Sequence, residues 1–168
     1  MTDDDASARL ALPLLYAAQA QKEDDHNEAL TRLDIAAQAV VQEVGQNAPP
    51  ADPLPGACWI VGETPSGAWA GHAGALAGWT SGGWRFVAPF EGMQAWNLAT
   101  GTMARRRAAQ WQSGALMGAS LSIAGTQVVG PQRAAIAAPA GGTTVDAQAR
   151  AAIGSVLAAL RGHGLIAS

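Results

Sequence analysis

The segment Gly-Trp-Thr-Ser-Gly-Gly-Trp at residues 78–84 decides the fold class that this sequence predicts. Trp79 and Trp84 flank Ser81-Gly82-Gly83, and a short glycine-containing turn between aromatic runs is typical of a β-hairpin. Tryptophan beside glycine recurs at residues 67–71 and 91–96. Large rings on short segments interrupted by glycine indicate a β-rich module.

Six tryptophans dominate an aromatic content that otherwise consists of two phenylalanines and one tyrosine. Such rings either fill the core of a small β module or form an exposed face for sugar rings or a partner protein. We expect core packing to take at least half of them. Trp79, Trp84 and Trp96 lie next to turns and are our candidates for an exposed partner-binding or glycan-binding face. Neither role is catalytic, so the sequence favours a binding or assembly module.

Helices are expected on both sides of this module. The first runs from about Ala18 into the thirties, with a buried stripe of His26, Leu30, Leu33, Ala37, Val40 and Val44. Val40-Val41 equally suits the start of a strand, because β-branched residues fit a pleated surface. The second helix follows Thr143 and Asp146, which form a predicted capping box. Its predicted buried stripe is Ile153, Val156, Leu157 and Leu160.

Together these patterns predict an α+β protein in which a small Trp-rich antiparallel β module is flanked by an N-terminal helix and a C-terminal amphipathic helix. The predicted strands are 57–61, 68–70, 76–79, 84–88, 94–98, 101–111, 119–123 and 126–129. We divide the chain into an attachment and oligomerisation segment (1–46), the β module (47–130), and a connector with the C-terminal helix (131–168).

Charge is unevenly distributed along a chain whose net charge is −3. Every acid except Asp146 precedes residue 92, and residues 92–145 contain four arginines and no acid. Opposite charges on the two halves favour contacts between copies of the chain. Arg105, Arg106 and Arg107 are candidate contacts for an acidic partner, although charges on a solvated edge strand also prevent aggregation. A nucleic-acid reader is usually basic overall, so no nucleic-acid partner is expected.

Catalytic and metal-binding patterns are weak. Cys58 is the single cysteine and is predicted to be a buried thiol in a reducing compartment. The three histidines are far apart, which does not suit a metal site, and no cofactor is expected. Glu63 and Glu91 lie among the tryptophans and are the local candidates for a hydrolase. The acidic start argues against a secretory signal, and no apolar run has membrane-spanning length.

Several segments resemble a family of domains of unknown function that is widespread in alphaproteobacterial prophages and gene transfer agents. The C-terminal part resembles the end of phage fibre-like proteins of that group. The N-terminal segments that carry the resemblance lie within residues 13–30, 59–62, 67–71, 76–79 and 83–92. The C-terminal ones are Ile123–Gly130, Gly141–Arg150 and Leu160–Ile166.

The resemblance implies a non-enzymatic component of the particle surface that is assembled in the bacterial cytoplasm. Its implied role is a base for a head spike or fibre, with capsid protein and a spike or fibre protein as partners. Copies are expected to form a homo-oligomer, a pentamer if it sits on a capsid vertex. The alternative is a carbohydrate-binding module that recognises a host surface or capsule glycan.

Overall fold

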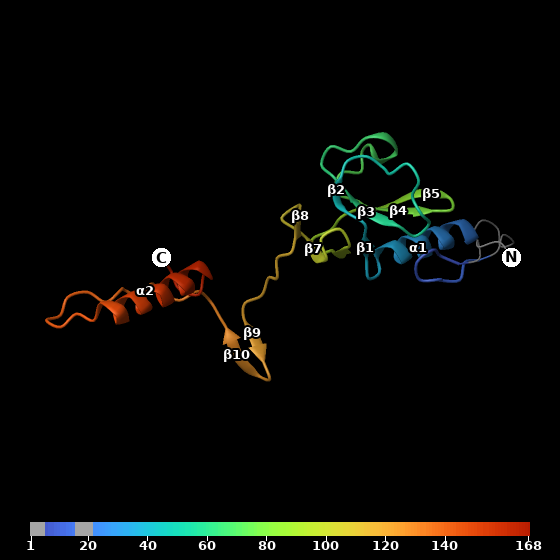
Figure 1. Ribbon diagram of the computed structural model, residues 1–168. Coiled ribbons are helices and arrows are strands. Elements are labelled where there is room, and N and C mark those ends of the chain that lie inside the picture. Colours follow the sequence, from blue (N-terminus) through green and yellow to red (C-terminus); the bar gives the residue numbers. More distant parts are fainter. Residues whose placement is uncertain (1–5, 16–21) are drawn as a thin grey trace. The chain divides into compact units, whose positions relative to one another are not determined.

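The computed structural model describes residues 6–15 and 22–168. The chain divides into two compact units, Met1–Ala115 and Leu116–Ser168 (Figure 1). The N-terminal unit contains helix α1, the short 3₁₀-helix η2 and strands β1 to β8. The C-terminal unit contains β9, β10 and helix α2. The predicted α+β class, with a helix on each side of the β strands along the sequence, is confirmed. Helix α1 packs against β4 and β5 within the N-terminal unit, and the division into three functional segments stays a prediction.

Two four-stranded sheets make up the N-terminal unit. The first has the order β1 (Val40–Val41), β6 (Gln94–Asn97), β7 (Thr102–Arg107) and β8 (Gln110–Ser113). The second has the order β2 (Val44–Gln46), β3 (Cys58–Val61), β4 (Leu76–Thr80) and β5 (Gly83–Val87). Their pairings are antiparallel except β1 with β6 and β2 with β3. The predicted hairpin at 81–83 is confirmed by the pairing of Thr80 with Gly83.

Two strand predictions differ from the structure. Residues 68 and 69 of the segment predicted at 68–70 lie in η2 (Gly67–Trp69), and Ala70 is its C-cap, because Gly67 has a φ of 58° and the Trp69 N–H donates to the Ser66 carbonyl. The segment 101–111 contains a turn between β7 and β8, at Ala108 and Ala109, which both have positive φ. Two consecutive positive φ values are the requirement of a tight hairpin turn, which sequence rules normally assign to asparagine and glycine.

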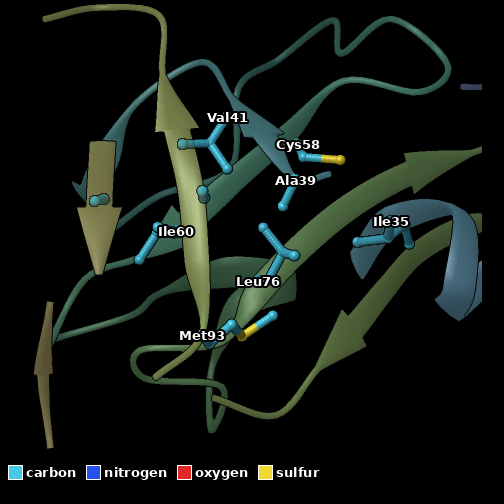
Figure 2. Packing of buried hydrophobic residues seen from close by; sticks show 9 residues of the cluster. Ile35, Ala39, Val41, Cys58, Ile60, Leu76 and Met93 are labelled. Carbon is cyan, nitrogen blue, oxygen red and sulfur yellow. The ribbon is translucent and has the colours of Figure 1, made fainter. Parts of the chain in front are cut away.

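The main core lies between the facing surfaces of the two sheets (Figure 2). Strand alternation turns Cys58 and Ile60 of β3 into this core, where they meet Val41 of β1 and Ala104 of β7. All four side chains are fully buried. Burial raises the pKa of the Cys58 thiol to about 11, so the prediction of a buried cysteine is confirmed.

Helix α1 (Lys22–Ala36) closes one end of this core through Ile35. A Cβ added at Gly78 of β4 would lie 2.6 Å from Ile35 Cδ1, so the absence of a side chain there allows the close approach. The predicted helical stripe is wrong, since Leu33 is 54% exposed and the helix ends before Val40. The start predicted at Ala18 lies outside the described residues. The alternative of a strand at Val40-Val41 is correct.

The inward side of α1 is mostly polar, which explains why apolar periodicity did not reveal it. Asp34 is 3% exposed, and its carboxylate accepts hydrogen bonds from Ser7 Oγ (2.8 Å), the Arg9 N–H (3.0 Å) and the Leu10 N–H (2.6 Å). The Arg9 guanidinium donates in return to the carbonyls of Asp34, Ile35, Ala37 and Gln38 at the end of the helix. A cation at a helix C-terminus is favourable because unpaired carbonyls gather there. Residues 6–15 are thereby fixed to α1.

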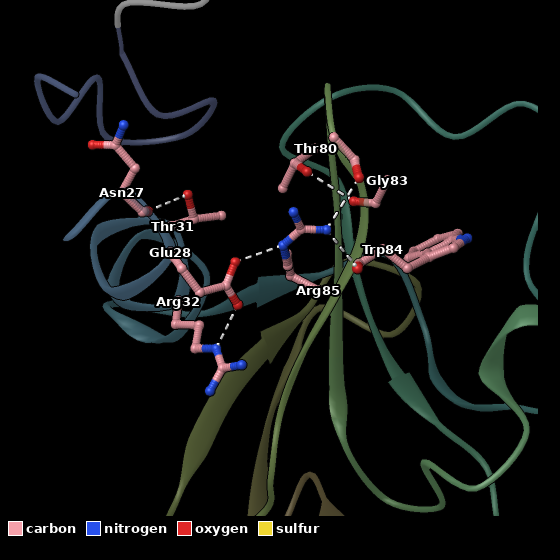
Figure 3. A network of polar contacts seen from close by, with 9 residues as sticks. Asn27, Glu28, Thr31, Arg32, Thr80, Gly83, Trp84 and Arg85 are labelled. Carbon is pink, nitrogen blue, oxygen red and sulfur yellow. Dashed lines mark hydrogen bonds and ion pairs between the residues drawn. The ribbon is translucent and has the colours of Figure 1, made fainter. Parts of the chain in front are cut away.

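A second polar network joins α1 to β5 (Figure 3). Glu28 lies 2.7 Å from Arg85 Nε on β5 and 2.7 Å from Arg32 Nε on its own helix. Partial burial acts to raise the pKa of Glu28, but hydrogen bonds and positive charge from Arg85 and Arg32 outweigh it and hold that pKa below 4.5. The carboxylate form is therefore favoured in the folded protein.

The C-terminal unit contains a two-stranded hairpin, β9 (Leu121–Ile123) with β10 (Thr126–Val129), and helix α2 (Ala147–Gly162). The turn predicted at Ala124-Gly125 is confirmed, but these strands pair with each other and do not continue the sheets. The predicted capping box is wrong, because Asp146 is itself the N-cap and accepts from the Ala149 N–H at 2.9 Å. Of the predicted buried stripe, Leu157 alone is buried, whereas Ile153 and Val156 are exposed.

The Glu28 network predicts a pH-dependent contribution to the stability of the N-terminal unit. Because folding lowers the pKa of Glu28, its contribution is present above pH 4.5 and is lost as the pH falls through the folded-state pKa. Glu28→Gln should destabilise the unit by about 1 kcal/mol or less at pH 7, since the pair is one-third exposed. Urea unfolding followed by tryptophan fluorescence measures this, because all six tryptophans lie in that unit.

The difference between wild type and Glu28→Gln should shrink below about pH 4. Glu43→Gln, which removes an exposed carboxylate between β1 and β2, is the control. An equal destabilisation by Glu28→Gln at pH 7 and pH 3 would contradict the assignment.

Candidate functional site

Four tryptophans form one cluster on the outer face of the β2–β5 sheet. Trp84 lies at its centre, with ring centroids 5.6 Å from Trp59, 5.1 Å from Trp69 and 5.0 Å from Trp79. Trp69 comes from η2 and is completely buried, and Trp59 is 7% exposed. Edge-to-face contacts at these distances stabilise a core beyond the area that they bury. This cluster is a second hydrophobic core.

Trp79 and Trp84 are therefore half-buried members of a packed cluster. Their rings make an angle of 61°, so they are not coplanar and do not offer a flat stacking face together. Trp79 also borders a cavity of about 450 Å³ between α1 and residues 6–14. Hydroxyl groups on the cavity wall bond within the chain, Ser7 to Asp34, Thr31 to Asn27 and Thr80 to Gly83. These three hydroxyl groups are therefore already engaged within the chain.

Trp96 has a different environment, on the outer face of the β1–β6–β7–β8 sheet. It is 41% exposed and pairs with Val40 on one side and Met103 on the other. The next row of the same face contains Gln94, Arg105 and Gln112. With the Gln94 amide oxygen turned toward Arg105, it accepts from Arg105 Nη2 at 3.0 Å and from Nε at 3.3 Å. We call this exposed ring, together with the neighbouring side chains of Gln94, Arg105 and Gln112, the Trp96 face.

The three arginines of β7 point to both faces of the sheet, as strand alternation predicts. Arg105 belongs to the Trp96 face. Arg106 points to the inner side, where a Cβ added at Gly74 would lie 3.1 Å from its Nη1, and its cross-strand neighbour Trp111 donates from Nε1 to the Gly74 carbonyl at 2.8 Å. Arg107 is exposed and lies opposite Gln110. Their role as contacts for an acidic partner stays a prediction.

The candidate acid–base residues have separate surroundings. Glu91 Oε2 accepts from the Ala108 N–H at 3.0 Å and so supports the β7–β8 turn. Glu63 follows β3 and lines a shallow hollow with Gln110 and Trp111. Within residues 6–15 and 22–168, no three His, Cys, Asp or Glu side chains gather as a metal site would require. Neither α1 nor α2 has the length and apolar character that a membrane-spanning helix needs.

The C-terminal unit exposes an apolar surface that sequence analysis missed. In this fully described unit only Leu157 and Ile166 are buried apolar side chains. Apolar side chains on the hairpin, the connector and α2 are exposed instead, and they include Leu121, Ile123, Val128, Val129, Ile136, Val145, Ile153 and Val156. The sequence spacing predicted an apolar stripe on α2, but spacing alone does not say whether that stripe is covered by the same chain or by a partner. The unit thus exposes many more apolar side chains than it buries.

The N-terminal unit is thus a small two-sheet domain with a closed tryptophan core and an exposed aromatic face at Trp96. The chain belongs to the family described as protein of unknown function DUF2793, whose model matches residues 26–112. The match runs from α1 into β8 and ends just before the C-terminal unit. No curated protein matches the chain.

The two tryptophan environments predict different costs of truncation. Trp84→Ala should destabilise the N-terminal unit by about 3 kcal/mol, because it removes the ring that three others contact. Trp96→Ala should cost clearly less, about 1 kcal/mol, because Trp96 is 41% exposed on the outer face of its sheet and belongs to neither core. Urea unfolding of both variants measures the difference, and equal costs would show that Trp96 is a core residue.

Proposed function

We propose that the protein is a structural component of a phage-like particle, a prophage virion or gene transfer agent, and acts as a head-spike or fibre base. In this role it mounts a receptor-binding fibre on the capsid. The observation that carries the proposal is the exposed apolar surface of the C-terminal unit, which needs a partner to cover it. The resemblance of the sequence to prophage and gene-transfer-agent proteins supplies the biological setting, and the family match at residues 26–112 is consistent with it.

The division into two units suits an adaptor. The N-terminal unit has its own two cores, and Trp59 and Trp69 are buried within it. The C-terminal unit buries two apolar side chains and exposes many more. An isolated two-stranded hairpin is marginally stable in water, so such a unit gains stability when it assembles. One part of the protein is then a rigid module and the other an interface.

Partners and location follow from this role. The protein would be made in the bacterial cytoplasm and built into the particle surface, with capsid protein and a spike or fibre protein as neighbours. Several copies would assemble together, five at a capsid vertex. The acid-free stretch 92–145 and the acidic N-terminal half would then steer neighbouring chains into register.

The Trp96 face favours a second candidate function, carbohydrate binding. An exposed indole provides a stacking surface for a sugar ring, and Gln94, Arg105 and Gln112 supply hydrogen-bonding groups beside it. A host surface or capsule glycan would be the ligand. One exposed ring supports weak binding at each copy.

Deletion of the gene from a producing strain tests the first candidate. We expect capsids that lack the fibre in electron micrographs, because the base that holds it is absent. The wild-type gene supplied in trans should restore the fibre, and mass spectrometry of purified particles should then detect the protein. Deletion particles with a normal number of fibres, or restored particles without the protein, would refute the role.

Binding to a glycan array tests the second candidate. The wild-type protein should bind selected glycans weakly, and Trp96→Ala should weaken binding about fivefold, because it removes a stacking contribution of about 1 kcal/mol. Phe90→Ala, which removes another exposed ring from the same unit, is the matched control. Equal binding by wild type and Trp96→Ala would exclude this face as the glycan site.

A further inference from the structure

The outer face of the β1–β6–β7–β8 sheet carries two rows of different character. The strand register places side chains on this face in rows that cross the sheet, with successive rows about 7 Å apart along each strand. The apolar row contains Val40, Trp96 and Met103. The polar row contains Gln94, Arg105 and Gln112. An apolar surface thus lies directly beside a row that contains a positive charge.

A shallow hollow borders the exposed indole. It has a volume of about 390 Å³, and the residues that line it include Gln38, Val40, Gln94, Trp96 and Met103. None of the described residues that line it is charged. Trp96 is 41% exposed and Met103 is 39% exposed, so the apolar wall is open to solvent. A largely apolar wall, two amide groups and a volume within the range of small-ligand sites suit a ligand of the size of a sugar.

Arg105 places a positive charge without a counter-ion at the edge of this hollow. With the Gln94 amide oxygen turned toward Arg105, that oxygen accepts from Nε and Nη2 of the guanidinium. A guanidinium has five N–H donors, so both donors of Nη1 and the second donor of Nη2 are left over. Nη1 and Nη2 form the fork that holds a carboxylate by two parallel hydrogen bonds. Among residues 6–15 and 22–168, no carboxylate forms an ion pair with Arg105.

The strands of this sheet add no negative charge to the Trp96 face. Strands β1, β6, β7 and β8 contain no acid. Arg107, two residues beyond Arg105 on β7, lies on the same side of the sheet. Glu91 precedes β6, and its carboxylate accepts from the Ala108 N–H at the β7–β8 turn. Charge complementarity therefore favours an anionic ligand on this face.

We infer, on the basis of the proposed carbohydrate-binding function, that the Trp96 face takes acidic sugars, that is, uronic or sialic acids. The sugar ring stacks on Trp96, and its carboxylate pairs with Nη1 and Nη2 of Arg105. An acidic peptide would account for the arginine but not for the exposed indole and the hollow beside it. A nucleic acid does not suit a chain whose net charge is −3.

Matched pairs of sugars test the inference. Oligosaccharides of uronic and sialic acids are each immobilised beside the same oligosaccharide after its carboxylates have been reduced to alcohols, and binding of the full chain is titrated on both forms. The wild-type protein should bind the acidic forms about tenfold more tightly, because reduction removes a charge-assisted pair. This preference should shrink when salt is raised from about 50 mM to about 0.5 M, because the pair lies at the surface.

Two variants separate the two contacts of the ligand. Arg105→Gln should abolish the preference for the acidic forms and leave binding of the neutral forms unchanged, because it removes only the charge-assisted pair. Trp96→Ala should weaken binding of both forms about fivefold, because both stack on the indole. Arg133→Gln, which removes an exposed arginine from the C-terminal unit, is the matched control for net charge and should bind like wild type. Circular dichroism checks that all three variants are folded.

The outcomes separate this inference from the function on which it rests. Equal binding of acidic and neutral forms by the wild type, or a preference that survives in Arg105→Gln, would overturn the inference and leave carbohydrate binding standing. Failure of the wild type to bind either form would refute carbohydrate binding and the inference together. A polyglutamate peptide that binds through Arg105 as tightly as the acidic sugars, with no loss in Trp96→Ala, would assign the face to an acidic polypeptide instead.

Discussion

One extended segment, Ala39–Gln46, hydrogen-bonds to both sheets, and the arrangement of the N-terminal unit depends on it. On one side the Trp96 N–H donates to the Ala39 carbonyl (2.8 Å) and the Leu98 N–H to the Val41 carbonyl (2.9 Å). Further along, the Gln42 N–H donates to the Cys58 carbonyl (2.8 Å) and the Ile60 N–H to the Glu43 carbonyl (3.0 Å). Because a chain that passes between sheets fixes their separation and register, the core can be filled by small residues such as Ala95 and Ala104.

How far the sequence predicts the structure depends on whether the deciding interactions are local. The hairpin at 81–83 and the start of α2 follow from residues that lie near one another in sequence, glycines in the turn and an acid before the helix. The cap of α2 is Asp146 itself, not the predicted pair of Thr143 and Asp146. The packing of α1 depends on Arg9 and Arg85, which lie 25 and 57 residues from Asp34 and Glu28. No local pattern contains such pairs, so the predicted buried stripe of α1 leaves out Asp34 and Glu28.

The candidate site shows the same limit. Trp96 was predicted among the exposed tryptophans, and alternation along β6 indeed leaves it on an outer face. The same reasoning could not separate it from Trp79 and Trp84, because Trp84 packs against Trp69, which arrives from a 3₁₀ turn that was predicted as a strand, and Trp79 packs against Trp84. Helix α2 was predicted, but Ile153 and Val156 of its predicted buried stripe are exposed. The helix instead turns Arg150 and Arg161 toward carbonyls of the connector 136–141.

Recognition through the Trp96 face depends on how many copies act together. Stacking on one exposed indole contributes about 1 kcal/mol, which alone corresponds to very weak binding of a sugar. If copies assemble as proposed, each contributes its own Trp96 face, and repeated weak contacts to a repeated glycan strengthen binding by about 10²-fold or more. Assembly would then be the condition under which one Trp96 face per chain suffices for recognition.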